Sequence, residues 1–417
     1  MRCGQGRFRD GRGSPSVSAV RTGTTRGGSV VIVGTGVAGI TAAESLRSNG
    51  FDGTITVFGD EPQLPYRRTA LSKNLVDGDL TDAKITLRPP GYWSDRGIEI
   101  VTSTRVADVD ASSRRVCLAD SSQVDYDALV LATGGRARRL PGTTSSPLAL
   151  RTRHDAAELR HAIQDGPVIV LGGGLIGLEI AAAVASTGDG SRVTVIERET
   201  SLLSRIVPAT VAEAVATLHR ERGVQILTGV VPTTITAESV TLADGRTLTG
   251  TVISAIGMEP DLELPHSAGI PVDAAGIVVD DLLRTRVPGV YAAGDVAARP
   301  HPLTGAPMRA EQWLTATEHG RLVAMTIAAD LGLDTGISTA VPRVPLAWTM
   351  QYTTNIQIVG WPTSGDRVEV DLDDSCSVVR AFAGSRLVGA VCLGRGGSGR
   401  SLRAEIESSL QPVGAHG

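Results

Sequence analysis

The feature that most constrains this chain is a strand–glycine loop–helix–strand pattern that occurs twice. The first copy reads SVVIVGTGVAGITAAESLRSNG from Ser29 and continues through TITVFGD to Asp60. Its apolar run Val30–Val33 is typical of a buried parallel strand. An Ala-rich helical segment follows the glycines. This order predicts a βαβ unit with G-x-G-x-x-G at the turn from the first strand into the helix.

The spacing of these glycines has a physical reason. Gly34 makes the tight turn, Gly36 lets the backbone approach a pyrophosphate, and Gly39 packs the helix against the strand. The phosphate then lies on the free N–H groups and the positive dipole end of the helix. Asp60 follows Gly39 by 21 residues, where an acid can accept a hydrogen bond from a ribose hydroxyl.

The second copy reads PVIVLGGGLIGLEIAAAVASTGDGSRVTVIE and repeats every part of the first. Its glycines are Gly172, Gly174 and Gly177, and Glu197 lies 20 residues after the last of them. One such motif is a weak signal. Two complete units, each with its acid, predict two nucleotide cofactors in one chain.

Two further strands end in small residues. YDALVLATGG ends at Thr133-Gly134, and VPGVYAAGDVA ends at Gly294-Asp295. Either segment could be a simple turn, but both offer a strand's carboxyl end to which a phosphate or ribityl chain can come close. Because the two segments flank the second unit, we expect the second unit to be inserted into the first domain.

The predicted fold class is therefore α/β, with two Rossmann-like dinucleotide-binding domains and a small C-terminal α+β domain. Alternating segments such as NIQIVGW, VEVDL, SVVRAFAG and RLVGAVCL predict an antiparallel sheet in the last domain, followed by a terminal helix. The predicted ranges are a disordered arm at 1–28, the first nucleotide domain at 29–143 and 255–338, the second at 144–254, and the C-terminal domain at 339–410.

Composition excludes several classes of function. The net charge of −4 argues against a nucleic-acid binder, and no run of 18 apolar residues predicts a membrane span. The first 28 residues lack the apolar core of a secretory signal, so a cytoplasmic protein is expected. The four cysteines form no C-x-x-C pair and no metal-ligand spacing, so no metal site is predicted.

Taken together, these motifs resemble the flavoprotein reductases with two dinucleotide folds. Within that group the chain is most similar to the ferredoxin and rubredoxin reductases that serve oxygenases, which are related to apoptosis-inducing factor. The resemblance covers about residues 29–405 and rests on VVIVGTGVAG, LPYRRTALSK, LVLATG, VIVLGGGLIGLEIAA, GVYAAGDVA, RAEQWLTATEHG and AWTMQY. It implies FAD in the first nucleotide domain and NAD(P)H in the inserted one, with NADH preferred over NADPH.

The resemblance also implies roles for single residues. Gly34, Gly36 and Gly39 would hold the FAD pyrophosphate, and Asp60 and Glu61 would meet the adenosine ribose. Arg68 and Lys73 would reach the FAD, Thr133-Gly134 and Asp295 would lie along it, and Trp313 and Trp348 would stand near the flavin ring. The family usually has two prolines where this chain has Thr69-Ala70, which changes the stiffness of that loop.

Lys73 and Lys84 are the only lysines in a chain with 40 Lys and Arg residues. A lysine carries a compact charge, whereas an arginine presents a wide planar fork. In a narrow site beside the flavin N5, the compact cation would fit and would favour the negatively charged reduced flavin. The alternative is an ordinary solvated loop lysine.

Glu179 interrupts the apolar run LIGLEIAAAVA near the start of the second motif's helix. An acid in the first turn of a helix is favoured by the helix dipole, which is the simpler interpretation. In the family the matching glutamate lies near the nicotinamide and pairs with the lysine. We therefore expect Lys73 and Glu179 to approach each other across a domain interface.

Glu197 bears on the choice between the two nicotinamide cofactors. An acid at this strand end accepts hydrogen bonds from a ribose 2′-OH and repels a 2′-phosphate, which favours NADH over NADPH. Arg198 follows directly and could weaken that preference.

The C-terminal domain departs from the family, in which an aromatic pair precedes Trp-Ser-Asp-Gln-Tyr. Here the segment reads Leu346-Ala347-Trp348-Thr349-Met350-Gln351-Tyr352. Trp348 matches the family, although it could instead be a core residue. We expect Leu346, Ala347 and Met350 to change the wall that faces the flavin edge.

Three classes of function stay open at this point. The first is an NADH:ferredoxin reductase that passes electrons to a [2Fe-2S] or similar ferredoxin for a haem monooxygenase or Rieske oxygenase. The second is a flavin-dependent oxidase or reductase that acts directly on a small molecule or on oxygen. The third is an NADH-sensing flavoprotein that acts as a binding module. The chain could be a monomer or a homodimer.

Overall fold

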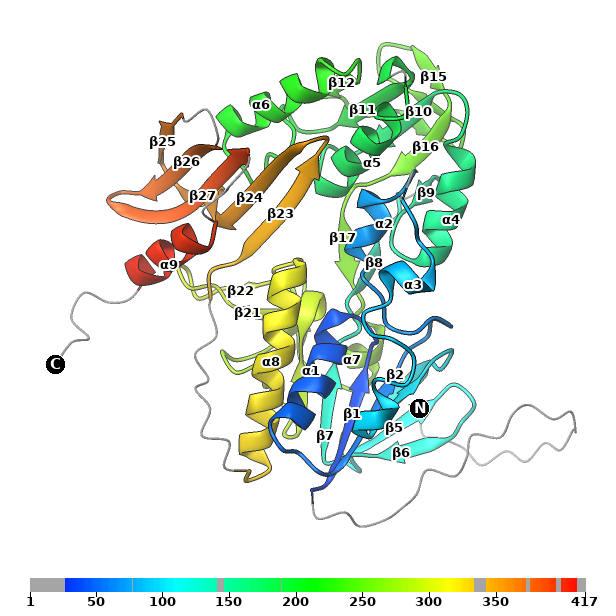
Figure 1. The fold of residues 1–417 in the computed structure, drawn as a ribbon, viewed down its shortest axis with the longest axis vertical. Helices are drawn as coiled ribbons and strands as arrows, with labels where there is room; N and C mark the ends of the chain where they lie inside the picture. Colours follow the sequence, from blue (N-terminus) through cyan, green and yellow to red (C-terminus); the bar gives the residue numbers. More distant parts are fainter. Residues whose placement is uncertain are drawn as a thin grey trace, which may run out of the picture.

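The computed structural model describes residues 27–76, 78–140, 146–188, 190–333, 343–372, 376–394 and 399–410. Most of the predicted N-terminal arm therefore lies outside the described residues, as do the predicted boundaries at 143/144 and 338/339. Figure 1 shows three parts, with the first nucleotide unit below, the second above it, and the C-terminal sheet beside the second. No helix among the described residues has the length and apolar character needed to cross a lipid bilayer.

The first nucleotide unit is built on a five-stranded parallel sheet in the order β20-β7-β1-β2-β3. Its strands are β1 (Ser29–Val33), β2 (Thr54–Phe58), β3 (Ile98–Val101), β7 (Ala128–Leu131) and β20 (Val290–Ala292). Strand β20 comes from far along the chain and pairs with β7. The first sheet is therefore completed by residues that follow the second nucleotide unit, which confirms the predicted insertion.

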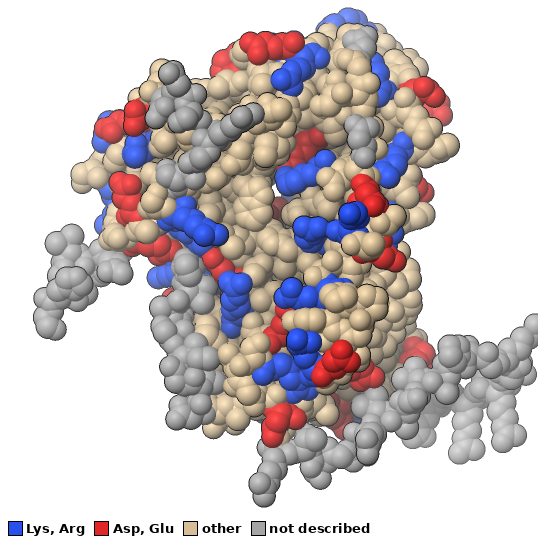
Figure 2. All heavy atoms as spheres, in the orientation of Figure 1, with Lys and Arg blue, Asp and Glu red and all other residues tan. Residues whose placement is uncertain are grey.

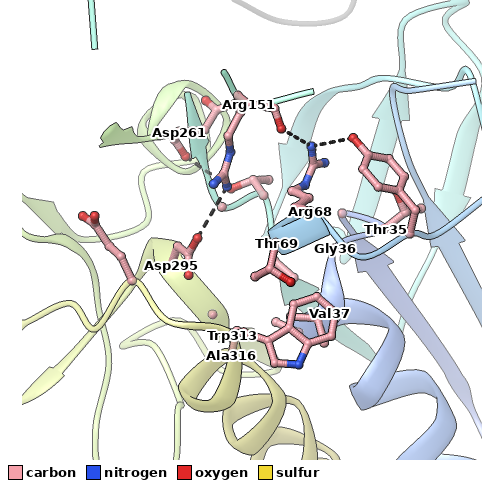
Figure 3. A pocket seen from close by; sticks show the side chains of 18 of the residues that line it. Thr35, Gly36, Val37, Arg68, Thr69, Arg151, Asp261, Asp295, Trp313 and Ala316 are labelled. Carbon is pink, nitrogen blue, oxygen red and sulfur yellow. Dashed lines mark hydrogen bonds and ion pairs between the residues drawn. The ribbon is translucent and has the colours of Figure 1, made fainter. Parts of the chain in front are cut away.

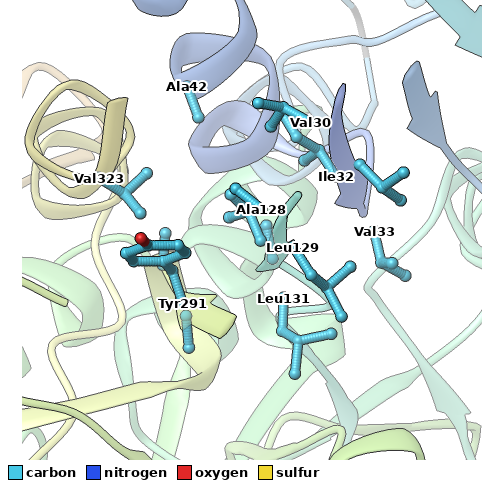
Figure 4. Close-up of a cluster of buried hydrophobic side chains, with 14 of the residues drawn as sticks. Val30, Ile32, Val33, Ala42, Ala128, Leu129, Leu131, Tyr291 and Val323 are labelled. Carbon is cyan, nitrogen blue, oxygen red and sulfur yellow. The ribbon is translucent and has the colours of Figure 1, made fainter. Parts of the chain in front are cut away.

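Two helices, α1 (Val37–Ser48) and α8 (Trp313–Asp330), pack together against this sheet (Figure 1). Figure 4 shows Val30, Ile32, Leu129 and Val323 among the side chains that fill the core between them. A Cβ added at Gly320 would lie 2.5 Å from the carbonyl oxygen of Ala38, so the two helices approach at backbone distance. This contact holds the start of α1, and with it the glycine loop, against the rest of the unit.

The second nucleotide unit repeats the architecture in the order β12-β11-β10-β16-β9, again with parallel strands. These strands are β9 (Leu148–Ala149), β10 (Val168–Leu171), β11 (Val193–Glu197), β12 (Gln225–Thr228) and β16 (Thr251–Ser254). The helices of this unit are α4 (Arg153–Ala162), α5 (Leu175–Ala185) and α6 (Ala209–Arg220).

Two short strands connect the two nucleotide units. Strand β8 (Gly135–Ala137) leads into the second unit, and β17 (Met258–Pro260) returns from it. They pair antiparallel, and an ion pair of 2.7 Å joins Arg136 to Glu259 across them. The chain therefore enters and leaves the inserted unit at adjacent positions.

The C-terminal part is the predicted antiparallel sheet, in the order β23-β24-β27-β26-β25. Its strands are β23 (Leu346–Gln351), β24 (Thr354–Gly360), β25 (Arg367–Asp371), β26 (Cys376–Ala383) and β27 (Arg386–Gly394), with α9 (Gly399–Leu410) packed on β27 and β24. Strand β23 runs along the second unit's α5, and this contact brings the third part to the site.

The remaining elements are short. They are α2 (Thr69–Lys73), α3 (Asp82–Ile85), α7 (Glu263–Ser267), four single turns of 3₁₀ helix at Ser94–Arg96, Gly190–Arg192, Gly294–Val296 and Pro362–Ser364, and three small sheets. These sheets are formed by β4 (Val106–Asp110), β5 (Arg115–Leu118) and β6 (Gln123–Asp125); by β13 (Thr234–Ile235), β14 (Ser239–Thr241) and β15 (Thr247–Thr249); and by β18 (Val272–Asp273), β19 (Gly276–Val278), β21 (Ala297–Pro300) and β22 (Pro307–Met308).

Candidate active site

A large pocket opens at the carboxyl ends of β1, β2, β7 and β20 and extends to α2, the start of α5 and β23. Figure 2 shows a hollow between the lower and upper parts of the molecule, with Lys and Arg side chains along its rim. The pocket is thus lined by all three parts of the fold. This is the edge of a parallel sheet at which ligands of such folds bind.

The first glycine motif leaves space in front of only one of its glycines. Gly34 has φ +119°, and an added Cβ there would lie 2.2 Å from the Ala132 carbonyl oxygen. A Cβ at Gly39 would lie 2.1 Å from the Gly34 carbonyl oxygen, whereas a Cβ at Gly36 would have no atom within 4 Å. The open position at Gly36 lines the pocket at the N-terminus of α1, so this cradle fits a phosphate group.

The second motif has the same geometry. Gly172 has φ +106° and closely faces the Ala255 carbonyl oxygen, and Gly177 closely faces the Gly172 carbonyl oxygen. Gly174 again has no atom within 4 Å of an added Cβ. The second unit therefore carries an equivalent phosphate cradle at the start of α5.

Most of the residues proposed from the sequence meet in the pocket. Its lining includes Gly34, Gly36, Asp60, Arg68, Lys73, Thr133, Gly134, Glu179, Asp295, Trp313 and Trp348. Gly39 and Glu61 lie behind the lining, and Gly172, Gly174, Gly177 and Glu197 belong to the second cradle. The roles of these residues are predictions.

Arg68 is held rigidly at the pocket. It forms an ion pair with Glu61 and donates hydrogen bonds of 3.0 Å each to the Tyr66 hydroxyl and the Arg151 carbonyl oxygen. Burial alone would lower the pKa of Arg68, but Tyr66 and Glu61 together raise that pKa above its ordinary value. Arg68 is therefore a fixed, permanent positive charge. Thr69, which replaces one of the family's prolines, is the first residue of α2 and also lines the pocket.

Arg151 is a pocket residue that the sequence did not reveal. Its guanidinium lies 3.4 Å from the Asp295 carboxylate, as Figure 3 shows, with Trp313 on the opposite side of the pocket. Arg151 stands between a short strand and a helix N-cap in LALRTRHD, where no motif distinguishes it. Thr35, Arg105 and Asp261 line the pocket without having been predicted either.

Lys73 and Glu179 form an ion pair between α2 and α5, which is the contact predicted across the domain interface. The Glu179 carboxylate also accepts hydrogen bonds from Ser72 and, at 2.6 Å, from the Thr349 hydroxyl. The side chain is 8% exposed. Since α5 begins at Leu175, Glu179 lies in the second turn, and the interpretation as a first-turn acid is wrong.

Trp348 is 43% exposed on β23, so the alternative that it is a core residue is wrong. Together with Leu346 and Ala347 it lines the pocket, as expected for the altered wall. Met350 is 44% exposed and lies outside the pocket lining, so its expected place in that wall is wrong. Met350 shares the outward face of β23 with Trp348, but it lies two residues, roughly 7 Å, further along the strand and therefore beyond the pocket's edge.

Glu197 ends β11 beside the second cradle. Its carboxylate accepts hydrogen bonds from the backbone N–H groups of Gly173 at 2.7 Å and Glu199 at 2.8 Å. Arg198 pairs with Glu199 at 2.8 Å. The acid is thus oriented toward the glycine loop, while the neighbouring arginine already has a carboxylate partner.

Among the described residues, no group of three His, Cys, Asp or Glu side chains could hold a metal ion.

The model of the pyridine nucleotide-disulphide oxidoreductase family matches residues 28–320. The chain belongs to this family. It is therefore an oxidoreductase of the pyridine nucleotide-dependent class.

Known proteins with similar sequences match this chain over most of their length. The chain is 37% identical to rhodocoxin reductase of Rhodococcus erythropolis, over 87% of this chain and 85% of that protein. It is 33% identical to the 3-phenylpropionate/cinnamic acid dioxygenase ferredoxin–NAD(+) reductase component of Photorhabdus laumondii, over 92% and 97%. A crystal structure of a covalent putidaredoxin reductase–putidaredoxin complex superposes with a TM-score of 0.85 at 31% identity, covering 92% of this chain and 93% of that one.

Proposed function

We propose that this oxidoreductase binds FAD in the pocket, takes hydride from NADH, and passes single electrons to an iron–sulfur ferredoxin that serves an oxygenase. The observation that carries the proposal is the Lys73–Glu179 pair, which stands in a pocket between two open phosphate cradles. The relatives named above as reductases of ferredoxin-dependent systems support the choice of partner.

When bound, FAD supplies uptake of two electrons as hydride and their release one at a time. The chain's own residues hold and orient that cofactor. The open backbone at Gly36 leaves room for the pyrophosphate, and the fixed guanidinium of Arg68 would attract the negatively charged cofactor. Asp295, braced by Arg151, lies along the pocket where a ribityl hydroxyl can donate to it.

Lys73 places one compact positive charge at the lining of this pocket. Its partner Glu179 comes from the other nucleotide unit, so the pair joins the FAD side of the pocket to the NADH side. A positive charge here stabilises negative charge that arrives with hydride. Trp348 and Leu346 complete the wall on the C-terminal side.

The second cradle accommodates NADH in this proposal. Gly174 leaves room for the pyrophosphate, and Glu197 receives the adenosine ribose hydroxyls. Ile176, 46% exposed at the start of α5, lines the pocket together with Glu179 and would offer an apolar surface to the nicotinamide.

No cysteine occurs among the described residues that line the pocket, so electron transfer to a redox disulfide is not part of the proposal. The decisive test is NADH consumption in air with the purified protein, with and without a [2Fe-2S] ferredoxin and cytochrome c. A slow basal rate that rises steeply with ferredoxin is expected. A fast basal rate that ferredoxin leaves unchanged would overturn the proposal and point to direct action on oxygen or a small molecule.

A further inference from the structure

The Glu179 carboxylate is the end point of a chain of hydrogen bonds that leads away from the pocket. Tyr352 Oη lies 3.1 Å from His219 Nδ1, and His219 Nε2 lies 3.2 Å from Gln351 Oε1. Gln351 Nε2 then lies 3.0 Å from Thr349 Oγ1, which lies 2.6 Å from Glu179 Oε1. Thr349, Gln351 and His219 are all 0% exposed.

The charge on Glu179 fixes the direction of every bond in this chain. A carboxylate only accepts hydrogen bonds, so the Thr349 hydroxyl must donate its single hydrogen to Glu179. Thr349 Oγ1 must then accept from the Gln351 amide, which turns the Gln351 carbonyl oxygen toward His219. His219 therefore carries its hydrogen on Nε2 and accepts from Tyr352 at Nδ1.

This arrangement requires a neutral His219. Burial lowers the pKa of His219 to about 4, and the nearby Arg222 acts in the same direction. The Arg222 guanidinium lies 4.2 Å from the centre of the Tyr352 ring and covers the outer end of the chain. The imidazole is therefore neutral at ordinary pH, as the hydrogen-bond directions demand.

The backbone is shaped to make these contacts. Thr349 and Gln351 face inward on β23, while Trp348 and Met350 between and beside them face outward. Tyr352 has φ +56°, a left-handed conformation that an aromatic residue rarely adopts. The resulting turn brings its ring to 5.1 Å from that of His219. An unfavourable backbone conformation held at the end of a buried polar chain points to a function.

This series of hydrogen bonds joins all three parts of the fold at the Glu179 carboxylate. Ser72 and Lys73 come from the first nucleotide unit, Glu179 and His219 from the second, and Thr349, Gln351 and Tyr352 from the C-terminal sheet. Since every partner donates toward Glu179, loss of any link leaves this carboxylate less well held beside Lys73.

We propose that Gln351 and His219 are positioning residues that act through Thr349 to hold the Glu179 carboxylate beside Lys73. They thereby set how fully the charge of Lys73 is balanced beside the bound flavin and, through it, the flavin reduction potential. This inference rests on the proposed function in so far as FAD occupies the pocket. It does not depend on the identity of the electron acceptor.

The test measures the midpoint potential of the bound flavin in purified holoprotein, without ferredoxin. Gln351→Leu and Thr349→Val leave the charge of Lys73 less balanced, so both are expected to raise the potential. A tenfold change in the reduction equilibrium corresponds to about 30 mV for this two-electron couple. Thr349→Ser keeps the hydroxyl and is expected to restore the wild-type potential.

Thr326→Val is the matched control, because Thr326 is 1% exposed and its hydroxyl bonds within and beside α8, outside the pocket lining. It is expected to lower thermal stability without moving the potential. If Gln351→Leu fails to retain FAD, His219→Phe tests the same link, since it keeps the ring but removes both nitrogens.

Unchanged potentials in Gln351→Leu, Thr349→Val and His219→Phe would overturn the inference, as would an equal shift in Thr326→Val. The proposed function is judged separately. A shifted potential in a protein that does not reduce ferredoxin would uphold the positioning role and reject the ferredoxin reductase proposal.

Discussion

Gly36 and Gly174 occupy equivalent places in the two glycine motifs, and at neither would a Cβ find an atom within 4 Å. At the first and third glycines of each motif, by contrast, an added Cβ would lie 2.5 Å or less from a backbone carbonyl oxygen. Within each motif, two glycines are required by the fold of the protein itself. The middle one meets no atom of the protein, and the proposed cofactors give a reason for it.

Gly36→Val is therefore expected to remove FAD binding while sparing the fold. Gly36 has φ −67° and ψ 173°, a conformation that any residue adopts. The free energy of unfolding of the variant apoprotein should therefore lie within about 1 kcal/mol of that of the wild-type apoprotein. Gly39→Ala is the contrasting variant, because its Cβ would collide with backbone and cost about 1–3 kcal/mol. Flavin absorbance after purification and urea unfolding of the apoproteins measure both effects. A Gly36→Val protein with full flavin content would contradict the assignment.

Gly174→Val is expected to show that the two phosphate cradles bind different cofactors. It should leave the flavin content unchanged and raise the KM for NADH by at least about tenfold, which corresponds to about 1.4 kcal/mol of lost binding. Steady-state kinetics at saturating acceptor provide the measurement. Loss of FAD from this variant, with NADH binding intact, would mean that the two cradles have the opposite occupants.

The two lysines make a natural pair of variants. Lys73→Met should lower the rate of flavin reduction by NADH by about 10²-fold, since a preorganised charge at the reacting centre is removed and Glu179 is left unpaired. Lys84→Met changes an exposed side chain and should leave that rate unchanged. Anaerobic rapid mixing with NADH resolves this step from later electron transfer. Equal rates in both variants would show that Lys73 has no role in the transfer of hydride to the flavin.

Glu197→Gln should shift the cofactor preference toward NADPH. The amide oxygen can still accept from the Gly173 N–H, so the loop is retained, while the charge that repels a 2′-phosphate is lost. We expect the ratio of kcat/KM for NADPH to that for NADH to rise by about tenfold, or about 1.4 kcal/mol of discrimination. An unchanged ratio would place the ribose away from this acid.

His219 predicts a specific loss of stability in acid. Its folded-state pKa of about 4 lies below the ordinary value of 6.5, so the unfolded chain binds the extra proton first as the pH falls. The stability that neutral His219 provides is complete above pH 6.5 and is lost as the pH falls toward 4. At 1.36 kcal/mol per pKa unit the loss is on the order of 3 kcal/mol. Urea unfolding at several pH values should show this slope in the wild type and a shallower one in His219→Phe.

The glycine motifs could be read from the sequence because their chemistry is local. Each turn, cradle and helix start is dictated within about six residues, so Gly34–Gly39 and Gly172–Gly177 carry the information by themselves. The same holds for the alternating strands of the C-terminal sheet. Their spatial order, with β27 between β24 and β26, is set by side-chain packing and has no local signature.

The polar contacts of the site were harder to predict. The approach of Lys73 to Glu179 followed from resemblance to a family, and no pattern in this chain alone would have revealed it. Arg151 and His219 carry no motif, since their partners Asp295 and Gln351 lie more than 100 residues away in the chain. The error over Met350 arose because the sequence does not show where along β23 the pocket ends. Met350 lies on the same face as Trp348 but roughly 7 Å further along the strand, outside the pocket lining.

The paired connectors β8 and β17 bear on how such an enzyme can be altered. Because Ala137 and Met258 are directly opposite each other, the host sheet needs only a tight turn there to close upon itself. The backbone of the inserted unit is thus joined to its host at one paired junction, while its α5 also packs against α2 and β23. Exchange at this junction offers a route to a different hydride donor, provided that the new unit keeps the residues that this one contributes to the pocket, Arg151, Ile176 and Glu179 among them.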